Sequence, residues 1–222
     1  MEGFINDFRK KKISGVNVTV PFKRSVINYL DILSSEAEKT QSVNTITLDQ
    51  NKLIGHNTDI FGFEQAIKKL NFKVCGKKIF ILGAGGVVPS IIYALDKMKA
   101  SSIIISNRTK EKAEKLKDQF NKINTLDWGE IPDFDLIINA TSLGLKNETI
   151  NLDFSKIKKN KLFYDLIYNP GETNFLKEGR KLGNLSENGK LMFVYQACEA
   201  FKLWNNIEPV INKDILKLLD ND

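Results

Sequence analysis

Cysteine and histidine are scarce in this chain of 222 residues. Cys75 and Cys198 lie far apart, and His56 is the single histidine. None of these residues has the spacing of a zinc motif, so we expect neither a metal site nor a disulfide. Long hydrophobic runs are also missing. No stretch approaches the ~20 apolar residues that span a bilayer, and the first residues lack the apolar core of a signal peptide. We therefore expect a cytoplasmic protein without membrane contacts.

The charge balance is only moderately basic. Lysine and arginine number 33 against 27 acidic residues, a formal net charge of +6. The lysines are scattered and not gathered in a stripe, so we expect no nucleic-acid partner. Net charge alone does not distinguish a nucleic-acid partner from a phosphorylated cofactor. A hydrophobic content of 42% is typical of a globular protein with one large or two small domains.

The first part of the chain reads as β-rich. Alternating β-branched residues predict a strand over 13–20, which Pro21 ends, and a helix over 22–33. Two further strands are predicted over 42–48 and 52–56, joined by a tight polar turn. A helix with apolar residues at helical spacing begins at Asp59.

From Lys77 onward, strands and helices alternate, and this pattern predicts a doubly wound α/β domain. The strands are unbroken apolar runs, as in a parallel sheet covered on both faces. From Leu191 two more helices are predicted. We therefore divide the chain into a small β-rich part (1–58), a nucleotide-binding part (59–188) and C-terminal helices (189–222). The predicted strands are 77–82, 102–106, 134–140 and 161–168, and the predicted helices are 89–98, 109–120, 191–204 and 210–219.

A glycine-rich turn, Gly-Ala-Gly-Gly-Val-Val, occupies residues 83–88 between a predicted strand and a predicted helix. Gly83 permits the tight turn, and Gly85 lets a pyrophosphate approach the backbone. The free amides of the helix N-terminus then face the phosphates. Val88 replaces the usual third glycine, which implies a slightly wider helix–strand spacing. An isolated motif of this kind is weak, but the flanking strand and helix strengthen it.

The next predicted strand ends in Ser-Asn-Arg-Thr, residues 106–109. NAD-binding folds place an acidic residue here for the ribose 2′-hydroxyl. This chain has Arg108 instead, with Lys112 one helical turn further on. A guanidinium group matches a 2′-phosphate, which favours NADP over NAD. Without the glycine turn, both cations would read as ordinary solvated charges.

Three short polar motifs precede the glycine turn: GVNVTVPFK, VNT and GHNTD. They contain Lys23 just past a predicted strand, Asn44, and Asp59 at a helix N-terminus, where a carboxylate is stabilised. Oxidation of an alcohol needs a base for the hydroxyl proton while hydride leaves for a nicotinamide. Lys23 is a candidate for that base, and Asp59 would orient it. Taken singly, each residue also has an interpretation without a catalytic role: Lys23 as a solvated lysine and Asp59 as a helix cap.

Together these motifs resemble the shikimate dehydrogenase family. The segments GVNVTVPFK, SVNT, GHNTD, GAGG, SNRT, NATSLG, DLIYNP and MFVYQACEAFKLW occur in the family's order over essentially the whole chain. The resemblance implies a substrate domain, a Rossmann-like NADP-binding domain and C-terminal helices that return to the substrate domain. It also implies the NADPH-dependent, reversible reduction of 3-dehydroshikimate to shikimate, on the route to chorismate and the aromatic amino acids.

The resemblance assigns roles to individual residues. Lys23 and Asp59 become the catalytic pair. Thr19, Asn44, Asp59, Tyr168 and Gln196 are expected to face the substrate, although Gln196 also reads as an ordinary polar residue of an amphipathic helix. Phe193, Phe201 and Trp204 read as core residues. The expected NADP-binding residues are Gly83, Ala84, Gly85, Gly86, Val87, Asn107, Arg108, Thr109, Lys112, Thr141, Ser142, Leu166 and Gly189.

The sequence departs from the family pattern in two respects. His56 replaces an acidic residue and Ile60 a glycine, and we interpret His56 as a loop residue. The family's N-terminal strand, with a Ser-x-Ser motif that holds the substrate carboxylate, does not occur in this sequence. We therefore expect a truncated chain or a misplaced start, an exposed sheet edge and weak shikimate binding.

Several alternatives remain open at this stage. A quinate/shikimate dehydrogenase of the same family that uses NAD is the nearest, and Arg108 and Lys112 argue against it. An inactive dinucleotide-binding fragment is the second. A nucleic-acid-binding protein is the third, and it rests on net charge alone. The sequence leaves the oligomeric state undecided, with a homodimer among the options.

Overall fold

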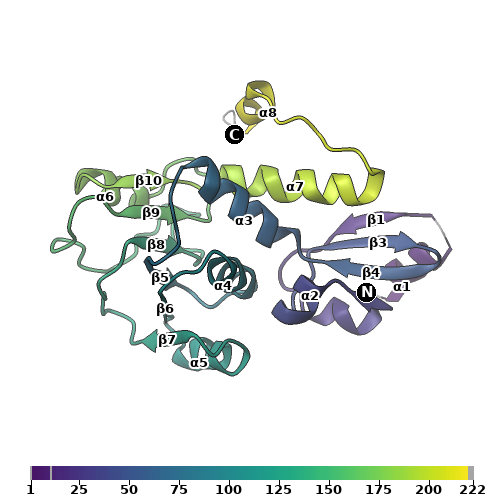
Figure 1. Ribbon diagram of the computed structural model, residues 1–222, viewed down its shortest axis with the longest axis horizontal. Helices are drawn as coiled ribbons and strands as arrows, with labels where there is room; N and C mark the ends of the chain where they lie inside the picture. The colour runs from purple at the N-terminus through teal and green to yellow at the C-terminus, as the bar shows by residue number, and fades with distance from the viewer. Residues whose placement is uncertain (1, 11, 220–222) are drawn as a thin grey trace.

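The computed structural model describes residues 2–10 and 12–219 and contains two sheets of different kinds (Figure 1). The smaller sheet has the strand order β1-β3-β4-β2. Its strand β3 is antiparallel to β1 and β4, whereas β2 runs parallel to β4. Strands β1 and β2 are therefore the two edges of the sheet. The bounds are β1 (Gly15–Asn17), β2 (Ile32–Leu33), β3 (Thr45–Asp49) and β4 (Lys52–His56).

Short helices close the core of this first domain. They are α1 (Glu2–Arg9), a 3-10 helix (Ser25–Tyr29) and α2 (Ser35–Thr40). Ile5 and Phe8 of α1 share a buried core with Val26 of the 3-10 helix and with Ile46 and Leu53 of the sheet. Helix α2 begins at an N-cap, because the Ser34 side chain accepts a hydrogen bond from the Ala37 amide at 3.2 Å.

Two predictions for this domain were wrong. The strand predicted over 13–20 is limited to 15–17, and the chain beyond it leaves the sheet through a cis peptide bond between Val20 and Pro21. The helix predicted over 22–33 is a 3-10 helix that ends at Tyr29 and is followed by β2. Pairing of Ile32 with Ile54 extends this segment, so tertiary strand pairing outweighs the local helical pattern.

The larger sheet contains six parallel strands in the order β10-β9-β8-β5-β6-β7. This is the doubly wound arrangement, and it confirms the predicted fold class. The strand order reverses between β5 and β8, so a crevice is expected at the carboxyl ends of these two strands. The bounds are β5 (Lys78–Leu82), β6 (Ser102–Ser106), β7 (Ile123–Leu126), β8 (Leu136–Asn139), β9 (Leu162–Asp165) and β10 (Leu185–Glu187).

Alternate residues of these strands feed two separate cores. Ile79 and Ile81 of β5 point to one face and Phe80 and Leu82 to the other. Helices α3, α4 and α5 contribute to the core of the first face, and α6 packs on the second. Both faces are covered, which explains the unbroken apolar runs in the sequence. The bounds are α3 (Thr58–Lys69), α4 (Val88–Lys97), α5 (Lys110–Gln119) and α6 (Asn174–Lys181).

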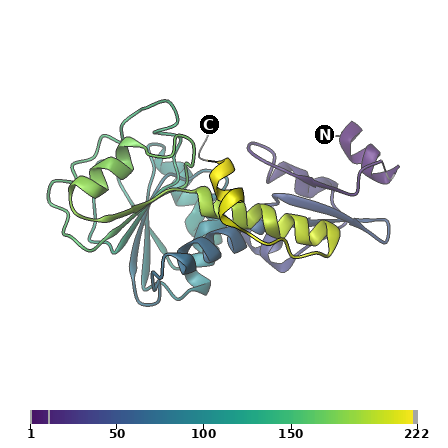
Figure 2. The same ribbon diagram turned by 90° about the horizontal axis from the view of Figure 1, so that it is seen from above.

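Helix α7 (Lys190–Asn205) joins the two domains. It lies along α3 and runs from the larger sheet back over the smaller one (Figures 1 and 2). Near its end the Trp204 indole donates a hydrogen bond to the Ile46 carbonyl at 3.0 Å. A Cβ at Gly15 would lie 2.2 Å from the Trp204 ring, so glycine permits this close contact. Helix α8 (Lys213–Leu218) lies beyond α7, on the side away from α3 (Figure 1).

A second contact between the domains is polar and buried. The Asn57 side chain, just before α3, donates hydrogen bonds of 2.9 Å to Thr40 of α2 and to Ser90 of α4. All three residues are buried. At the rim of this contact the Lys39 ammonium lies 5.8 Å from the centre of the Tyr93 ring. Together with α7, these contacts fix how the two domains meet.

Residues 2–10 and 12–219 contain no helix long and apolar enough to cross a membrane. The same residues hold no group of three or more His, Cys, Asp or Glu side chains placed to bind a metal ion. Cys75 and Cys198 are free thiols.

Candidate active site

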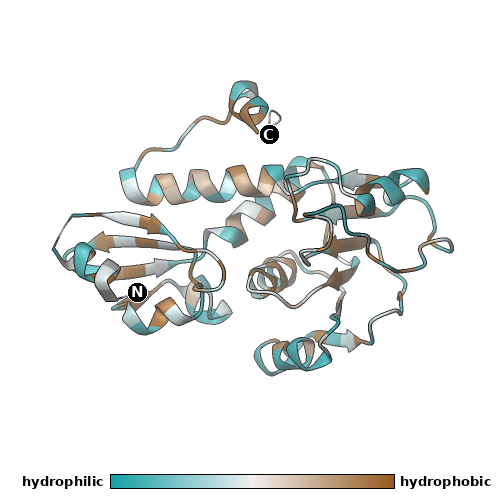
Figure 3. Ribbon diagram, turned by 180° about the vertical axis from the view of Figure 1, so that it is seen from behind, coloured by the Kyte–Doolittle hydropathy of each residue, from teal (hydrophilic) through white to brown (hydrophobic). Residues whose placement is uncertain are grey.

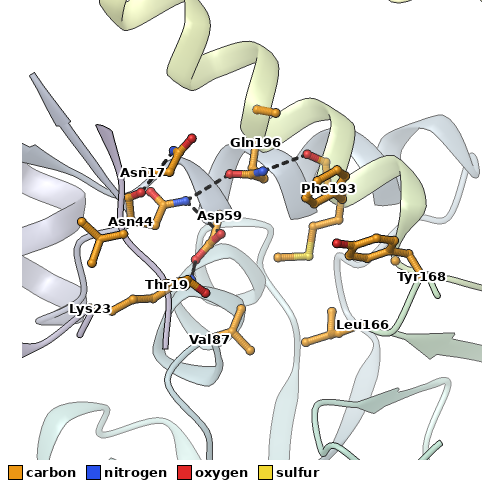
Figure 4. A pocket seen from close by; sticks show the side chains of 14 residues that line it. Asn17, Thr19, Lys23, Asn44, Asp59, Val87, Leu166, Tyr168, Phe193 and Gln196 are labelled. Carbon is orange, nitrogen blue, oxygen red and sulfur yellow. Dashed lines mark hydrogen bonds and ion pairs between the residues drawn. The ribbon is translucent and has the colours of Figure 1, made fainter. Parts of the chain in front are cut away.

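A cavity of about 480 Å³ lies where the two domains and α7 meet (Figure 4). It brings together residues from both ends of the chain. Every residue that the sequence pointed to for chemistry or for substrate contact lines it. The lining residues are Asn17, Val18, Thr19, Lys23, Asn44, Asp59, Val87, Leu166, Tyr168, Gly189, Met192, Phe193, Gln196 and Ala197.

Lys23 and Asp59 form an ion pair in this cavity. The Lys23 Nζ lies 2.5 Å from Asp59 Oδ2, and the two side chains are 12% and 8% exposed. The Lys23 carbonyl accepts a hydrogen bond from the Val43 amide, which holds this loop against the sheet. Asp59 lies in the first turn of α3, where the helix dipole stabilises a carboxylate. An ammonium group that is shielded from bulk water and directed by a carboxylate is suited to proton exchange with a substrate oxygen.

Asn44 connects this pair to the rest of the site. Its Nδ2 donates to Asp59 Oδ1 at 2.9 Å and lies 3.3 Å from Gln196 Oε1. Its Oδ1 accepts the Thr58 amide at 2.7 Å. Asp59 therefore uses one oxygen for Lys23 and the other for Asn44, so its orientation is fixed from two sides.

Tyr168 and Phe193 form one wall of the cavity. Their rings stack with centroids 4.5 Å apart and planes 24° from parallel. The Phe193 carbonyl accepts a hydrogen bond from Gln196 Nε2 at 3.0 Å. The interpretation of Phe193 and Phe201 as core residues was wrong, because they are 37% and 42% exposed. Phe193 lines the cavity and Phe201 is exposed nearer the end of α7, and the amphipathic pattern alone did not distinguish these positions from packed ones.

The interpretation of His56 as a loop residue was wrong, whereas the strand predicted over 52–56 already contained it. His56 is the last residue of β4, and its Nε2 lies 3.1 Å from the Thr47 hydroxyl on β3. Burial lowers the pKa of its imidazole, and Glu36 partly offsets this. His56 does not line the cavity of Lys23.

A second cavity, of about 390 Å³, lies at the carboxyl ends of β5, β6 and β8. The glycine turn forms one side of it. Gly83 has a φ of +109°, and a Cβ there would lie 2.7 Å from the Ala140 carbonyl oxygen. Only glycine fits this position, which lies at the reversal point of the strand order, so the turn suits a pyrophosphate. The lining residues are Gly83, Ala84, Gly85, Asn107, Arg108, Lys112, Trp128, Ala140, Thr141, Ser142, Leu143, Thr149 and Asn151.

Arg108 and Lys112 line this second cavity as the sequence suggested. Gly86 and Thr109 do not line either cavity. The Gly86 carbonyl accepts from the Ser42 hydroxyl at 3.4 Å, and the Thr109 carbonyl accepts from Asn107 at 2.7 Å. Val87, Leu166 and Gly189 line the cavity of Lys23 instead, so this part of the expected NADP set lies beside the residues expected to face the substrate.

A buried polar cluster lies beneath both cavities. Asp165 at the end of β9 accepts hydrogen bonds from Asn139, Thr173 and the Ile167 amide, at 3.0, 2.6 and 3.0 Å. Asn139 at the end of β8 in turn accepts from the amide and hydroxyl of Thr141. The cluster thus holds the loop of Thr141 at one cavity and the loop of Leu166 and Tyr168 at the other.

Several lining residues were not among the predicted site residues. Asn17 lies on β1 in the same motif as Thr19, and its polar side chain was the available signal. Met192 and Phe193 gave an apolar signal that does not separate a pocket wall from a core. Trp128, Thr149 and Asn151 of the second cavity lie in loops without a recognisable motif.

A doubly wound parallel sheet with a glycine turn at its reversal point, next to a cavity that holds a lysine–carboxylate pair, defines a two-domain dinucleotide-dependent dehydrogenase. Residues 1–46 match the family model for the shikimate dehydrogenase substrate binding domain, and residues 64–167 match that for shikimate / quinate 5-dehydrogenase. The chain belongs to the shikimate dehydrogenase family.

Known relatives resemble the chain over almost its whole length. It is 54% identical to the NADP(+) shikimate dehydrogenase of Pelagibacter ubique, with 99% of this chain and 83% of the relative covered. The shikimate dehydrogenase structure from Aquifex aeolicus has a TM-score of 0.90 and 36% identity, covering 100% of this chain and 82% of that one. The Thermus thermophilus enzyme, solved with NADP(H) and shikimate, has a TM-score of 0.89 and 28% identity, covering 99% and 82%.

Proposed function

We propose that this chain is an NADP-dependent shikimate dehydrogenase that reversibly reduces 3-dehydroshikimate to shikimate, a step towards chorismate and the aromatic amino acids. The observation that carries the proposal is the Lys23–Asp59 pair in a cavity that adjoins a glycine-lined crevice with two cations. The family to which the chain belongs supports the choice of substrate.

The chain's own residues supply proton transfer and orientation. Bound NADPH would supply the hydride. Lys23 donates a proton to the carbonyl oxygen of the substrate during reduction, and it accepts the hydroxyl proton in the reverse direction. Asp59 holds the amine of Lys23 in place through Oδ2. Asn44 keeps Asp59 in its rotamer through Oδ1, so the pair is preorganised before the substrate binds.

The polar lining of the cavity is suited to a small polyhydroxylated acid. Thr19, Asn44, Tyr168 and Gln196 present hydroxyl and amide groups that can pair with substrate hydroxyl and carboxylate groups. Met192 and the Phe193 ring supply the apolar surface for a carbocyclic ring.

The proposal is tested by following NADPH formation with the purified chain and shikimate. We expect turnover that requires both shikimate and NADP. A higher kcat/KM with quinate or with NAD would instead support the quinate/shikimate alternative. Binding of NADPH without any turnover would support an inactive dinucleotide-binding protein and contradict the proposed activity.

Arg108→Leu should reduce the preference for NADP. The variant removes a cation from the proposed 2′-phosphate site and leaves the glycine turn intact. We expect the Kd for NADPH to rise about 10-fold or more, because a charge-assisted hydrogen bond contributes roughly 1.5–3 kcal/mol. The Kd for NADH should change little, since NADH has no 2′-phosphate. Calorimetric titration with both cofactors measures this, and an equal loss for both would contradict the phosphate role.

A homodimer is supported by an exposed apolar surface at the C-terminal end. Large hydrophobic side chains are exposed on the last turns of α7, in the segment after it and on α8. Figure 3 shows hydrophobic residues, coloured brown, along this C-terminal part of the ribbon. A twofold contact would bury the same patch on both copies. We expect about twice the chain mass of 25.2 kDa by light scattering, and the monomer mass for Val210→Asp. A monomeric wild type would contradict the dimer. The exposed residues are Phe201, Leu203, Ile207, Val210, Ile215 and Leu218.

The free state of both cysteines supports a cytoplasmic location. Cys75 is exposed and both cysteines are free, as is usual for thiols in a reducing compartment. We therefore place the proposed reaction in the cytoplasm.

A further inference from the structure

Trp128 is the one aromatic side chain among the described residues that line the cofactor crevice. It follows β7 and is partly buried. It packs on the second core of the larger sheet, alongside the partly buried Ile104 and Leu143. One side of the indole is therefore supported by apolar side chains, while the residue still contributes to the wall of the crevice. Trp128 takes no part in the proposed proton transfer or in the proposed binding of the phosphates.

The backbone that carries Trp128 is tied to the strand that carries Arg108. The Ser106 hydroxyl, buried at the end of β6, donates to the Asp127 carbonyl at 3.2 Å. The Asp127 carboxylate lies 2.6 Å from Lys110 Nζ at the start of α5. Residues 127 and 128 are thus held on both sides of the segment that contains Arg108. The backbone that carries the indole is therefore tied to the segment that carries the guanidinium.

The covalent structure of NADP restricts where its adenine can lie. The 2′-phosphate and the base are attached to neighbouring carbons of one ribose, so a phosphate held by Arg108 and Lys112 keeps the base within one sugar ring of them. The glycine turn takes the pyrophosphate on the other side of that ribose. Among the residues that line the crevice together with these cations, the large apolar side chains are Trp128 and Leu143.

We propose that Trp128 forms the wall against which the adenine of the cofactor stacks, and that it thereby determines much of the affinity for the adenosine half. This inference rests on the proposed NADP-dependent function and assigns a residue to one part of that site. A base stacks on any aromatic face, and the tryptophan offers the largest one. The apolar support behind the indole keeps it in place before the cofactor binds, so little order is lost on binding.

The first test measures binding of adenosine 2′,5′-bisphosphate, which carries the base and the 2′-phosphate but no nicotinamide. Trp128→Leu should raise its Kd and the Kd for NADPH by about the same factor, roughly ten-fold. Trp128→Phe is the matched control, because it keeps an aromatic face, and it should stay within about three-fold of the wild type. Wild-type affinity of a folded Trp128→Leu for the bisphosphate would overturn the proposal.

The decisive signal of the second test comes from a variant that retains Trp128. The chain has two tryptophans, so Trp204→Phe leaves Trp128 as the single indole. Adenosine 2′,5′-bisphosphate does not absorb at the emission wavelength of tryptophan and quenches only by contact. We expect saturable quenching in Trp204→Phe and none in Trp128→Phe, where Trp204 remains. Quenching absent from the first variant, although calorimetry shows binding, would overturn the inference.

Failure of this inference is distinguishable from failure of the proposed function. If the wild type binds neither NADPH nor the bisphosphate, the NADP-dependent function itself is wrong. If the wild type binds NADPH and oxidises shikimate, while Trp128 shows neither an affinity change nor quenching, only the assignment of Trp128 is wrong.

Discussion

Replacing Lys23 with methionine should lower kcat for shikimate oxidation by about 10²- to 10⁴-fold, the usual contribution of a positioned acid–base group. Methionine keeps the length of the side chain and removes the amine that lies 2.5 Å from Asp59. Binding of NADPH should change little, because Lys23 does not line the crevice of the glycine turn. Steady-state rates at saturating substrate and calorimetric titration of NADPH measure the two quantities.

Asn17→Ala serves as the matched control for this variant. Asn17 lines the same cavity, but its side chain donates to the Asn44 carbonyl and the Thr45 hydroxyl and not to the ion pair. We expect a loss in kcat that is far smaller than that of Lys23→Met. If folded Lys23→Met retains the wild-type kcat, the role of Lys23 in proton transfer is refuted.

Asp165→Ala should be among the most destabilising single changes in this chain. The substitution leaves three buried donors without their acceptor: the Asn139 amide, the Thr173 hydroxyl and the Ile167 backbone amide. We expect the free energy of unfolding to fall by about 3–5 kcal/mol, because a buried donor without a partner costs roughly 1–3 kcal/mol. Urea unfolding measures this. A loss below about 1 kcal/mol would show that the cluster does not stabilise the fold.

Thr173→Val is the graded comparison. It removes one of the three donors and leaves the other two hydrogen bonds to Asp165 in place. It also removes the N-cap of α6, since the Thr173 side chain accepts from the Leu176 amide. A loss of about 1–3 kcal/mol is expected, smaller than that of Asp165→Ala.

The effect of Asp165 on stability should also depend on pH. Burial raises the pKa of its carboxyl group, and the hydrogen bonds from Thr173, the Ile167 amide and Asn139 partly offset this. A raised pKa in the folded state means that stability is greatest below the pKa of an unfolded aspartate, about 3.9. It falls as the pH rises through the higher folded pKa. The advantage of the wild type over Asp165→Asn should therefore shrink with rising pH.

Helices and strands were predicted with accurate bounds where the sequence pattern of the segment itself determines the structure. Strands β4 and β6 occupy the predicted residues, 52–56 and 102–106. For β6, burial on both faces leaves a continuous apolar run that a strand explains by itself. Helix α5 was predicted to within one residue, because its charged outer face and few apolar positions repeat with helical spacing.

The elements that were missed depend on partners far along the chain. Strand β10 has three residues and exists because it pairs with β9. Strand β2 has two residues and pairs with β4. Segments this short carry no periodicity of their own, so the sequence had no signal that could outweigh the helical reading of residues 22–33.

The sequence predicted which residues form the candidate site but not the hydrogen bonds that join them. Motifs pointed to Lys23, Asp59, Asn44 and Gln196, and the structure brings all four into one cavity. That Asn44 bonds both Asp59 and Gln196 was not predictable, because the contact with Gln196 spans 152 residues. The exposed side of α7 was equally hidden, since its apolar residues occur on more than one face.

The contact of α7 with the first domain joins residues far apart in the sequence, and this affects folding during synthesis on the ribosome. Trp204 bonds the Ile46 carbonyl from 158 residues further along the chain. At elongation rates of about 5–20 residues per second, those residues take on the order of ten seconds or more to synthesise. Until then the face of β3 beneath α7 stays uncovered. The first domain therefore emerges from the ribosome with one face exposed. Chaperone binding to nascent chains should be strongest before residue 204 leaves the exit tunnel.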